Sequence, residues 1–364
     1  MKVTLTQERL SRALSVVGRI ASSRTTLPIL SSILIKTNGN NLILSSTNLE
    51  IAITEIVSAK IEKEGVLTTP ARLLVEFIAN LPKVNITLEL IDSKLLITAG
   101  NYKSTINTTN VEEFPEIPNV NSKTKLVIPA ELFKKAVSTT TLVASSDATR
   151  PILTGVYVYS SNNNLYFAAT DGYRLAEKQV MKTNDDISLI IPASTLNDVA
   201  RILSDNTKEV VVGFSDDQIS FEVDNTVITS RLIDGSFINY RQLIPSKTDV
   251  VATINKSEFI RVVKIAELFA RESAGSITVK TNSADSVLNV HSITSQIGEN
   301  NTEVEAAITG DGTVTLNSKF LLDGLNQFDD ESIKIQFSGK VAPILLTSDK
   351  SGDYKHLIMP VKSQ

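Results

Sequence analysis

The sequence predicts an α+β protein built from three repeated domains, each an antiparallel sheet with two helices. Two observations predict this fold class. Similar strand–helix segments recur at a spacing of about 124 residues, and each recurrence is followed by segments that alternate apolar and polar residues. A chain of 364 residues exceeds one ordinary domain, and its hydrophobic fraction of 42% is enough for more than one core.

The first recurrent segment is a short strand that runs into a helix. It occurs three times, at residues 3–14, 126–137 and 252–263. The copies share an aliphatic strand position occupied by Leu5, Ile128 and Ile254. An acidic residue near each helix start is favoured there by the helix dipole. Helices are therefore predicted over residues 8–19, 131–144 and 257–271.

A second strand–helix segment recurs with nearly the same spacing. Its copies lie at residues 67–81, 189–203 and 314–328, and they align Leu74, Leu196 and Leu321. In each copy the strand ends at a proline or a polar cap residue, which is typical of a helix start. The predicted helices cover residues 71–80, 194–203 and 318–328. A third match relates residues 42–53 to residues 165–176.

Alternating segments separated by Asp, Asn or Gly predict hairpins at residues 94–109, 218–233 and 343–360. The glycine-rich run 309–314 is also predicted to be a hairpin turn rather than a nucleotide-binding loop. Two stretches rich in Pro and polar residues, 111–125 and 240–250, are predicted linkers. We therefore expect domains at residues 1–120, 121–246 and 247–364.

The composition excludes several kinds of active site. The chain has no cysteine, and its two histidines, His291 and His356, lack the neighbours of a metal site. Neither a P-loop nor a GxGxxG motif occurs, and the paired carboxylates lie in polar loops. We therefore expect a binding protein without catalytic residues, metal or cofactor. The first residues lack the apolar core of a signal peptide and no run is long enough to span a membrane, so we expect a cytoplasmic location.

The predicted helices are more basic than the rest of the chain. They carry 11 basic and seven acidic residues, a charge of about +4 within a total of −4. Such faces could follow a phosphate backbone without reading bases, although they could equally be ordinary solvated helix faces. An odd number of sheet-forming repeats also leaves two unlike edge strands. Unlike edges can pair head-to-tail, and a head-to-tail contact that closes gives a ring.

The run "TDGYRLA" at residues 170–176 interrupts an alternating pattern. It could be an active-site loop, a binding ridge or a tight hairpin turn. In the simplest structural interpretation, Asp171 and Gly172 make the turn and Leu175 fills the core. In the functional interpretation, Tyr173 and Leu175 offer apolar surface to a partner.

Four motifs together resemble the bacterial DNA polymerase III β subunit family, the sliding clamps. They are "TLPIL" (26–30), "TDGYRLA" (170–176), "RLIDGSFINYRQLIP" (231–245) and "IMPVK" (358–362). The resemblance implies a head-to-tail dimeric ring that encloses duplex DNA and tethers the replicative DNA polymerase, without catalytic activity. It also implies binding to the clamp loader and to other proteins that carry the clamp-binding motif.

The resemblance places a peptide-binding groove between the second and third domains. Its implied residues are Leu153, Thr170, Gly172, Tyr173, Arg174, Leu175, Pro245, Pro343, Ile344, Met359, Pro360 and Val361. The residues implied to contact DNA are Arg24 and Arg72. Tyr173 stands where some members have His. Asn48 stands where Asp is common, so the first-repeat copy of the motif is expected to be structural only.

Two other functions compete with a sliding clamp. A triplicated scaffold that binds proteins without enclosing DNA would share the repeats and the groove. A hydrolase with a site on a loop is disfavoured by the absence of Cys and by the isolated histidines. A clamp stays on circular DNA and slides off linear ends, which neither alternative would do.

Overall fold

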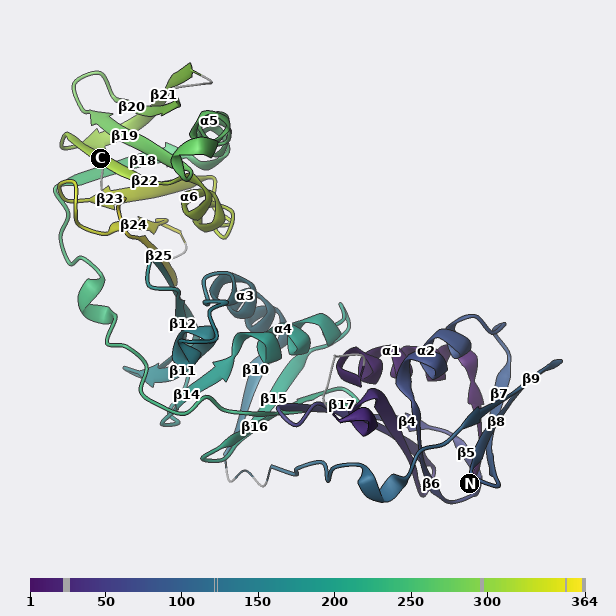
Figure 1. Cartoon of the computed structure of the whole chain (residues 1–364). Coiled ribbons are helices and arrows are strands. Elements are labelled where there is room, and N and C mark those ends of the chain that lie inside the picture. The colour runs from purple at the N-terminus through teal and green to yellow at the C-terminus, as the bar shows by residue number, and fades with distance from the viewer. Residues whose placement is uncertain (22–26, 121, 123, 295–297, 351, 362–364) are drawn as a thin grey trace. The chain divides into compact units, whose positions relative to one another are not determined.

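The computed structural model describes every residue except 22–26, 121, 123, 295–297, 351 and 362–364. The chain divides into two compact units (Figure 1). Unit 1 comprises residues 1–131 and 198–232, and unit 2 comprises residues 132–197 and 233–364. Both units combine antiparallel sheets with helices, which confirms the predicted α+β class.

The described residues form six α-helices, one at each predicted position. They are α1 (Gln7–Ala21), α2 (Ala71–Ala79), α3 (Ala130–Thr141), α4 (Ala193–Ile202), α5 (Lys256–Ala270) and α6 (Ser318–Leu325). Side-chain caps begin two of them: Asn255 accepts a hydrogen bond from Glu258 N–H, and Asn317 accepts bonds from Lys319 and Phe320 N–H. None of the helices among the described residues is long and apolar enough to cross a membrane.

Each long helix buries one apolar stripe against a sheet. In α5 the stripe is Phe259, Val262, Val263 and Ala266, at the three- and four-residue spacing of a helix face. Helix α1 packs on β3, β4 and α2. Gly18 allows the close approach of α1 to α2, because a Cβ there would lie 2.8 Å from Val75 Cγ2.

Unit 1 contains two sheets, with strand orders β5-β1-β7-β8-β9 and β10-β15-β16-β17-β4-β3-β2-β6. The strands from the first part of the chain are β1 (Lys2–Thr6), β2 (Ser32–Asn38), β3 (Asn41–Thr47), β4 (Ile51–Ser58), β5 (Lys60–Lys63), β6 (Val66–Pro70), β7 (Asn85–Ile91), β8 (Lys94–Ala99) and β9 (Tyr102–Asn107). The others are β10 (Lys125–Pro129), β15 (Glu209–Phe214), β16 (Gln218–Val223) and β17 (Thr226–Arg231).

Unit 2 contains one long sheet with the strand order β14-β11-β12-β13-β25-β24-β23-β18-β21-β20-β19-β22. Its strands from the second repeat are β11 (Gly155–Ser161), β12 (Asn164–Thr170), β13 (Arg174–Lys182) and β14 (Ser188–Pro192). Those from the third repeat are β18 (Val250–Asn255), β19 (Ser276–Asn282), β20 (Val287–Thr294), β21 (Gly298–Thr309), β22 (Gly312–Asn317), β23 (Ser332–Phe337), β24 (Ile344–Thr347) and β25 (Tyr354–Ile358).

Antiparallel strand pairs join successive repeats into continuous sheets. Strand β17 of the second repeat pairs with β4 of the first, and β25 of the third pairs with β13 of the second. The three predicted hairpins are present as β8–β9, β16–β17 and β24–β25.

The pairings of β17 with β4 and of β25 with β13 would be continued by β9 and β21. Among the described residues, each of these two strands has an unpaired side. Strand β9 pairs only with β8, and the first part of β21, Gly298–Glu305, pairs only with β20. The pairing that joins successive repeats is therefore unfilled at β9 in the first copy and at residues 298–305 of β21 in the third, among the described residues.

One predicted turn has a different role. Residues 309–314 do connect two strands, but β22 pairs with β19 rather than with β21, so the prediction of a hairpin was wrong. Gly310 has φ +80°, and a Cβ there would lie 2.2 Å from Asp249 O. The glycine thus permits a close approach of two backbones.

The two histidines have no metal-binding partners among the described residues. His356 on β25 is fully buried, and its Nδ1 lies 2.9 Å from the Tyr354 hydroxyl. Burial, assisted by the charge of nearby Arg174, lowers the pKa of His356 to about 3. The imidazole is therefore neutral at physiological pH, and it packs as part of the core against Gly324 of α6.

The turn after β3 holds a leucine in a left-handed conformation. Leu49 has φ +75° and is 49% exposed. Its N–H donates to Thr47 Oγ1, and the N–H groups of Glu50 and Ile51 donate to Asn48 Oδ1. These side-chain bonds hold the turn although its central residue has a Cβ that disfavours positive φ.

We expect Leu49→Gly to stabilise unit 1, because it relieves a strain of roughly 1–2 kcal/mol and removes only a half-exposed side chain. The greater freedom of glycine in the unfolded chain offsets part of this gain. The midpoint of thermal unfolding, measured by calorimetry, should rise by a few degrees. Leu49→Ala is the matched control, since it shortens the side chain but keeps the Cβ. A fall in the midpoint for Leu49→Gly would contradict the strain.

Candidate functional site

The "TDGYRLA" run forms a tight turn between β12 and β13 that its own side chains hold closed. Asp171 Oδ1 accepts hydrogen bonds from the N–H groups of Tyr173 and Arg174 at 2.9 and 3.0 Å. Thr170 Oγ1 accepts from Gly172 N–H at 3.0 Å and donates to Arg174 O at 2.6 Å. Gly172 has φ +91°, which a glycine adopts without strain.

The pairing of β13 with β25 brings this turn beside the end of the chain. Arg174 lies opposite Ile358, and Leu175 lies opposite Leu357. The ladder continues past β25, because Met359 N–H donates to Tyr173 O at 2.8 Å. The "TDGYRLA" and "IMPVK" motifs are therefore neighbours in space.

A small apolar pocket lies where these segments meet. It has a volume of about 80 Å³ and is lined by Thr170, Gly172, Arg174, Leu175, Ile238, Leu243, Leu357 and Met359. Leu175 and Leu357 are buried and form its floor. Ile238, Leu243 and Met359 are 43%, 43% and 38% exposed, so apolar surface remains available around the mouth.

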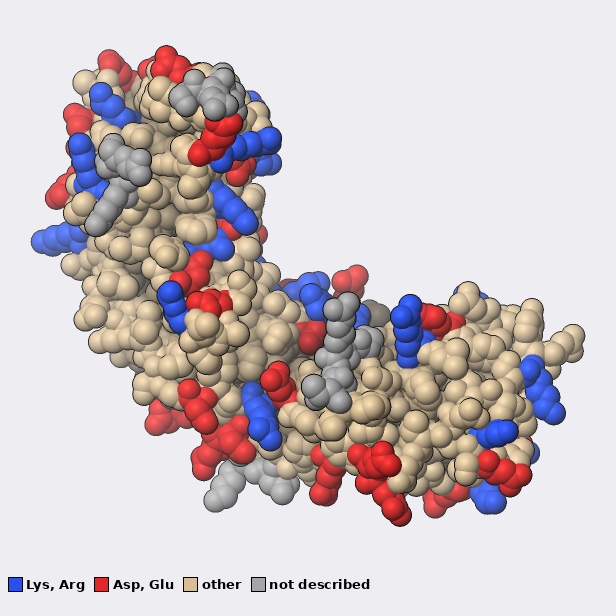
Figure 2. Space-filling view, viewed as in Figure 1, with Lys and Arg blue, Asp and Glu red and all other residues tan. Residues whose placement is uncertain are grey.

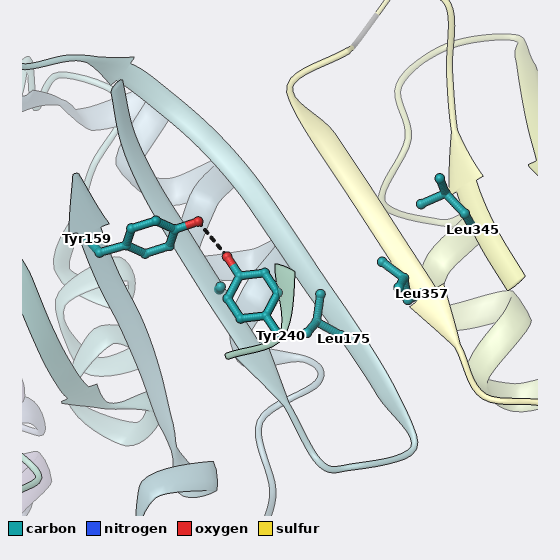
Figure 3. Packing of buried hydrophobic residues seen from close by; sticks show 6 residues of the cluster. Tyr159, Leu175, Tyr240, Leu345 and Leu357 are labelled. Atoms are coloured by element: carbon teal, nitrogen blue, oxygen red, sulfur yellow. Dashed lines mark hydrogen bonds between the residues drawn. The ribbon is translucent and has the colours of Figure 1, made fainter. Parts of the chain in front are cut away.

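Ile238 and Leu243 form one wall of the pocket. Both belong to residues 233–245, a segment that crosses the sheet and that we call the strap. Tyr240 and partly buried Phe237 and Ile244 pack against a core cluster that contains Leu175 and Leu357. Figure 3 shows Tyr240 beside Leu175, with Leu345 and Leu357 on the neighbouring strands. The strap overlaps the predicted linker 240–250, and it contributes to the pocket rather than only connecting repeats.

Arg174 is a structural cation at the base of the turn. Its side chain is 11% exposed and forms ion pairs with Asp171 and with Asp323 of α6. Its Nη2 donates to Leu142 O, and its guanidinium lies 4.5 Å from the Phe320 ring centroid. The guanidinium charge is therefore already paired within the protein. Arg174 lines the pocket without presenting an unpaired charge to it.

The structure brings five of the predicted groove residues to the pocket: Thr170, Gly172, Arg174, Leu175 and Met359. The other seven do not line it. Tyr173 is 63% exposed, whereas Ile344 is fully buried in β24 opposite Ile358. Half-buried positions outside the pocket lining are occupied by Leu153, Pro245, Pro343 and Pro360, and Val361 is 39% exposed.

Three lining residues were not predicted from the sequence: Ile238, Leu243 and Leu357. Ile238 and Leu243 lie within the motif 231–245, of which only Pro245 was expected in the groove. An available signal was that both are apolar residues in a segment rich in polar and turn-forming residues. Leu357 and its neighbour His356 are both buried in β25, so the sequence does not show which of them faces the pocket. The pairing of β13 with β25 places Leu357 opposite Leu175.

A basic cleft of about 790 Å³ lies in unit 1, where the first and second repeats join. Four exposed arginines line it: Arg9, Arg12 and Arg19 from α1, and Arg201 from α4. The opposite wall includes Glu55 of β4, whose pKa is raised by burial although Thr226 donates a hydrogen bond to it. Asp198 neutralises Arg201 in part, at 3.1 Å.

The charges of unit 1 are distributed unevenly. Figure 2 shows acidic side chains gathered along the strand side of unit 1, at the bottom of the view. Of the two predicted DNA contacts, Arg72 lies on α2, where it is 84% exposed and pairs with Glu76 at 2.9 Å. Such an exposed pair contributes little stability, so the guanidinium can exchange partners readily. Arg24 lies outside the described residues.

Family comparisons cover almost the whole chain. Three family models match it in order: the N-terminal domain of the DNA polymerase III beta subunit over residues 1–118, the central domain over 127–239 and the C-terminal domain over 241–362. The matches follow the three repeats.

Individual relatives are similar over their full lengths. A beta sliding clamp of Streptococcus pneumoniae is 29% identical over 366 residues, covering 97% of each chain. That of Staphylococcus aureus is 27% identical over 376 residues, covering both chains completely. The crystal structure of the DNA polymerase sliding clamp from Bacillus subtilis superimposes with a TM-score of 0.96 at 27% identity, over 100% of each chain.

Proposed function

The chain belongs to the DNA polymerase III β subunit family, whose members are non-catalytic sliding clamps, and we propose how its own residues serve that activity. Two copies pair head-to-tail into a ring around duplex DNA. The apolar pocket of unit 2 binds peptide segments of the replicative polymerase, the clamp loader and other partners. We take the domains as residues 1–120, 121–246 and 247–364.

The pocket is the observation that carries this proposal. A concave apolar site with an exposed aliphatic rim suits the insertion of one bulky side chain from an extended peptide. The rim residue Met359 is unbranched and flexible, so it can adapt to different inserted side chains. A site of this kind favours one short motif carried by several partners over a single large interface.

The basic cleft supports contact with the DNA backbone. Arginine side chains bind phosphate oxygens in any base context, so Arg9, Arg12 and Arg201 suit the sequence-independent binding of a sliding ring. We propose that they act together with Arg24 and Arg72. Because no aromatic residue lines the cleft within the described residues, base stacking has no support there.

The open strand edges support head-to-tail pairing of two copies. Strands β17 and β25 pair with β4 and β13, and β9 occupies the corresponding place in the first repeat. Its counterpart would be the open part of β21 in a second copy. Exposed Lys103 on β9 and exposed Glu299 and Glu303 on β21 have opposite charges, which favours this pairing.

We expect Met359→Ala and Leu243→Ala each to weaken peptide binding by roughly tenfold to a hundredfold, because truncating a pocket anchor costs about 1–3 kcal/mol. Calorimetry with an extended peptide from the cognate polymerase, carrying Leu and Phe side chains, measures the effect. Val66→Ala is the matched control, since Val66 is 39% exposed and lies in unit 1. Unchanged affinity in both pocket variants would mean that the peptide binds elsewhere.

The combined substitution of Arg9, Arg12 and Arg201 by Ala should shorten retention on nicked circular DNA by several-fold. The salt dependence of binding should also become shallower, by roughly 0.9 in log–log slope for each phosphate that is no longer neutralised. The charge-matched control replaces Lys36, Lys63 and Lys94, three exposed strand lysines. If the lysine variant is retained equally poorly, the cleft has no special part in binding DNA.

Thr105→Pro on β9 should convert the dimer to monomers in sedimentation experiments. Thr108 N–H bonds to Ser93 O, so the alternation of the antiparallel ladder directs the Thr105 N–H away from β8. Proline there removes a donor from the open edge while leaving the β8–β9 hairpin intact. Thr105→Val keeps the N–H and should remain dimeric. A dimeric proline variant would exclude β9 as the paired edge.

A further inference from the structure

We propose that Tyr240 is a positioning residue for the pocket. Its buried hydroxyl anchors the strap to the sheet, and this anchor holds Ile238 and Leu243 in place as one pocket wall. The inference rests on the proposed function of the pocket as a peptide site, and it adds a residue that does not line the pocket.

The backbone of Tyr240 is bonded to both wall residues. Tyr240 N–H donates to Ile238 O at 2.9 Å, and Leu243 N–H donates to Tyr240 O at 2.8 Å. Tyr240 is 3% exposed, whereas Ile238 and Leu243 are each 43% exposed. The strap therefore turns inward at Tyr240 and outward at the residues on either side that form the wall.

The hydroxyl of Tyr240 is bound in a polar network beneath the strap. It donates to Glu177 Oε2 at 2.6 Å and lies 2.6 Å from the Tyr159 hydroxyl, the bond drawn in Figure 3. Arg241 and Lys355 lie 3.6 and 3.4 Å from the Glu177 carboxylate, whose side chain is 4% exposed. A buried carboxylate with two cations and a hydroxyl donor from the strap is a strong and directional anchor.

This network lies next to the pocket floor on the same face of the sheet. Glu177 follows Leu175 by two positions on β13, and Lys355 precedes Leu357 by two positions on β25. The pair Glu177–Lys355 is therefore the ladder position that follows the pair Leu175–Leu357 on that face. An anchor at Glu177 sets the position of the strap relative to the floor that the inserted side chain would contact.

The Tyr240 hydroxyl remains a donor over the physiological pH range. Burial, and then the negative charge of Glu177, raise the pKa of Tyr240 well above its ordinary value. Tyr240→Phe removes this donor but keeps the ring, which makes an edge contact with Phe237 at 6.2 Å between centroids. The substitution therefore separates anchoring by the hydroxyl from packing of the ring.

Calorimetry with the polymerase-derived peptide tests the inference in the full-length dimer. We expect Tyr240→Phe to weaken binding by about five- to twentyfold, as the loss of a buried charge-assisted hydrogen bond would. Tyr157→Phe is the matched control, because the Tyr157 hydroxyl lies 3.2 Å from Ser188 Oγ at an exposed position. We expect less than a twofold change for this control. Unchanged affinity in Tyr240→Phe would overturn the inference.

A double-mutant cycle separates positioning from general destabilisation. If Tyr240 acts through the wall, Tyr240→Phe should weaken binding by less than about twofold once Leu243→Ala has removed part of that wall. An equal effect in both backgrounds would overturn the inference. Faster amide hydrogen exchange in residues 233–245 of Tyr240→Phe is also expected, and unchanged exchange there would count against it.

The pocket variants distinguish a failure of the proposed peptide site from a failure of the positioning role of Tyr240. If Met359→Ala and Leu243→Ala leave affinity unchanged, the proposed peptide site itself is wrong. If both weaken binding and Tyr240→Phe does not, only the positioning role is wrong. Should Tyr240→Phe fail to fold, Glu177→Gln replaces it, since the amide oxygen still accepts a hydrogen bond but without the charge. We expect a smaller weakening in the same direction, and no weakening would overturn the inference.

Discussion

The antiparallel pairing of β13 with β25 joins the second repeat to the third, and every feature of the pocket depends on its register. This register places Leu175 opposite Leu357 and Glu177 opposite Lys355. A shift of β25 by one residue would turn Leu357 to the opposite face of the sheet and would remove its half of the pocket floor. The same ladder carries Met359 to the carbonyl of Tyr173, so the rim is defined by backbone hydrogen bonds rather than by side-chain packing alone.

Around the pocket, the charged groups are paired with other protein groups, whereas apolar side chains remain exposed to solvent. Arg174 is bound to Asp171, Asp323 and Leu142 O, and Glu177 is bound to the two tyrosines and two cations. The Glu177 side chain is 4% exposed and the Arg174 side chain 11% exposed, and both are paired, because an unpartnered charge at either position would be strongly destabilising. The surface left around the mouth is therefore aliphatic. A partner would be selected mainly by the shape of its inserted side chain.

Much of this arrangement could be predicted from the sequence where the signal is local or repeated. The six helices follow from apolar spacing and polar starts, and the turn at 170–174 follows from its Thr, Asp and Gly. The wall residues Ile238 and Leu243 could not be found in this way, because their role depends on a strap that folds back over a distant strand. The hairpin expected at 309–314 failed for a related reason: local alternation does not reveal which strands pair, and β22 pairs with β19.

The first repeat contains a second copy of the turn. The two copies share their backbone hydrogen bonds but differ in the side chains that line the pocket in the second repeat. Thr47 and Asn48 accept the same backbone bonds as Thr170 and Asp171, and Arg231 N–H bonds to Glu50 O as Met359 N–H bonds to Tyr173 O. The residues equivalent to Leu175, Leu357 and Met359 are Ala52, Thr229 and Arg231. The backbone scaffold is thus repeated, while the apolar floor and rim are not. Gly172 also leaves the mouth of the second-repeat turn free of a side chain, where the first repeat has Leu49. The pocket in this repeated fold therefore arises from a few side chains added to a turn whose geometry is maintained by Thr and Asx hydrogen bonds in both copies.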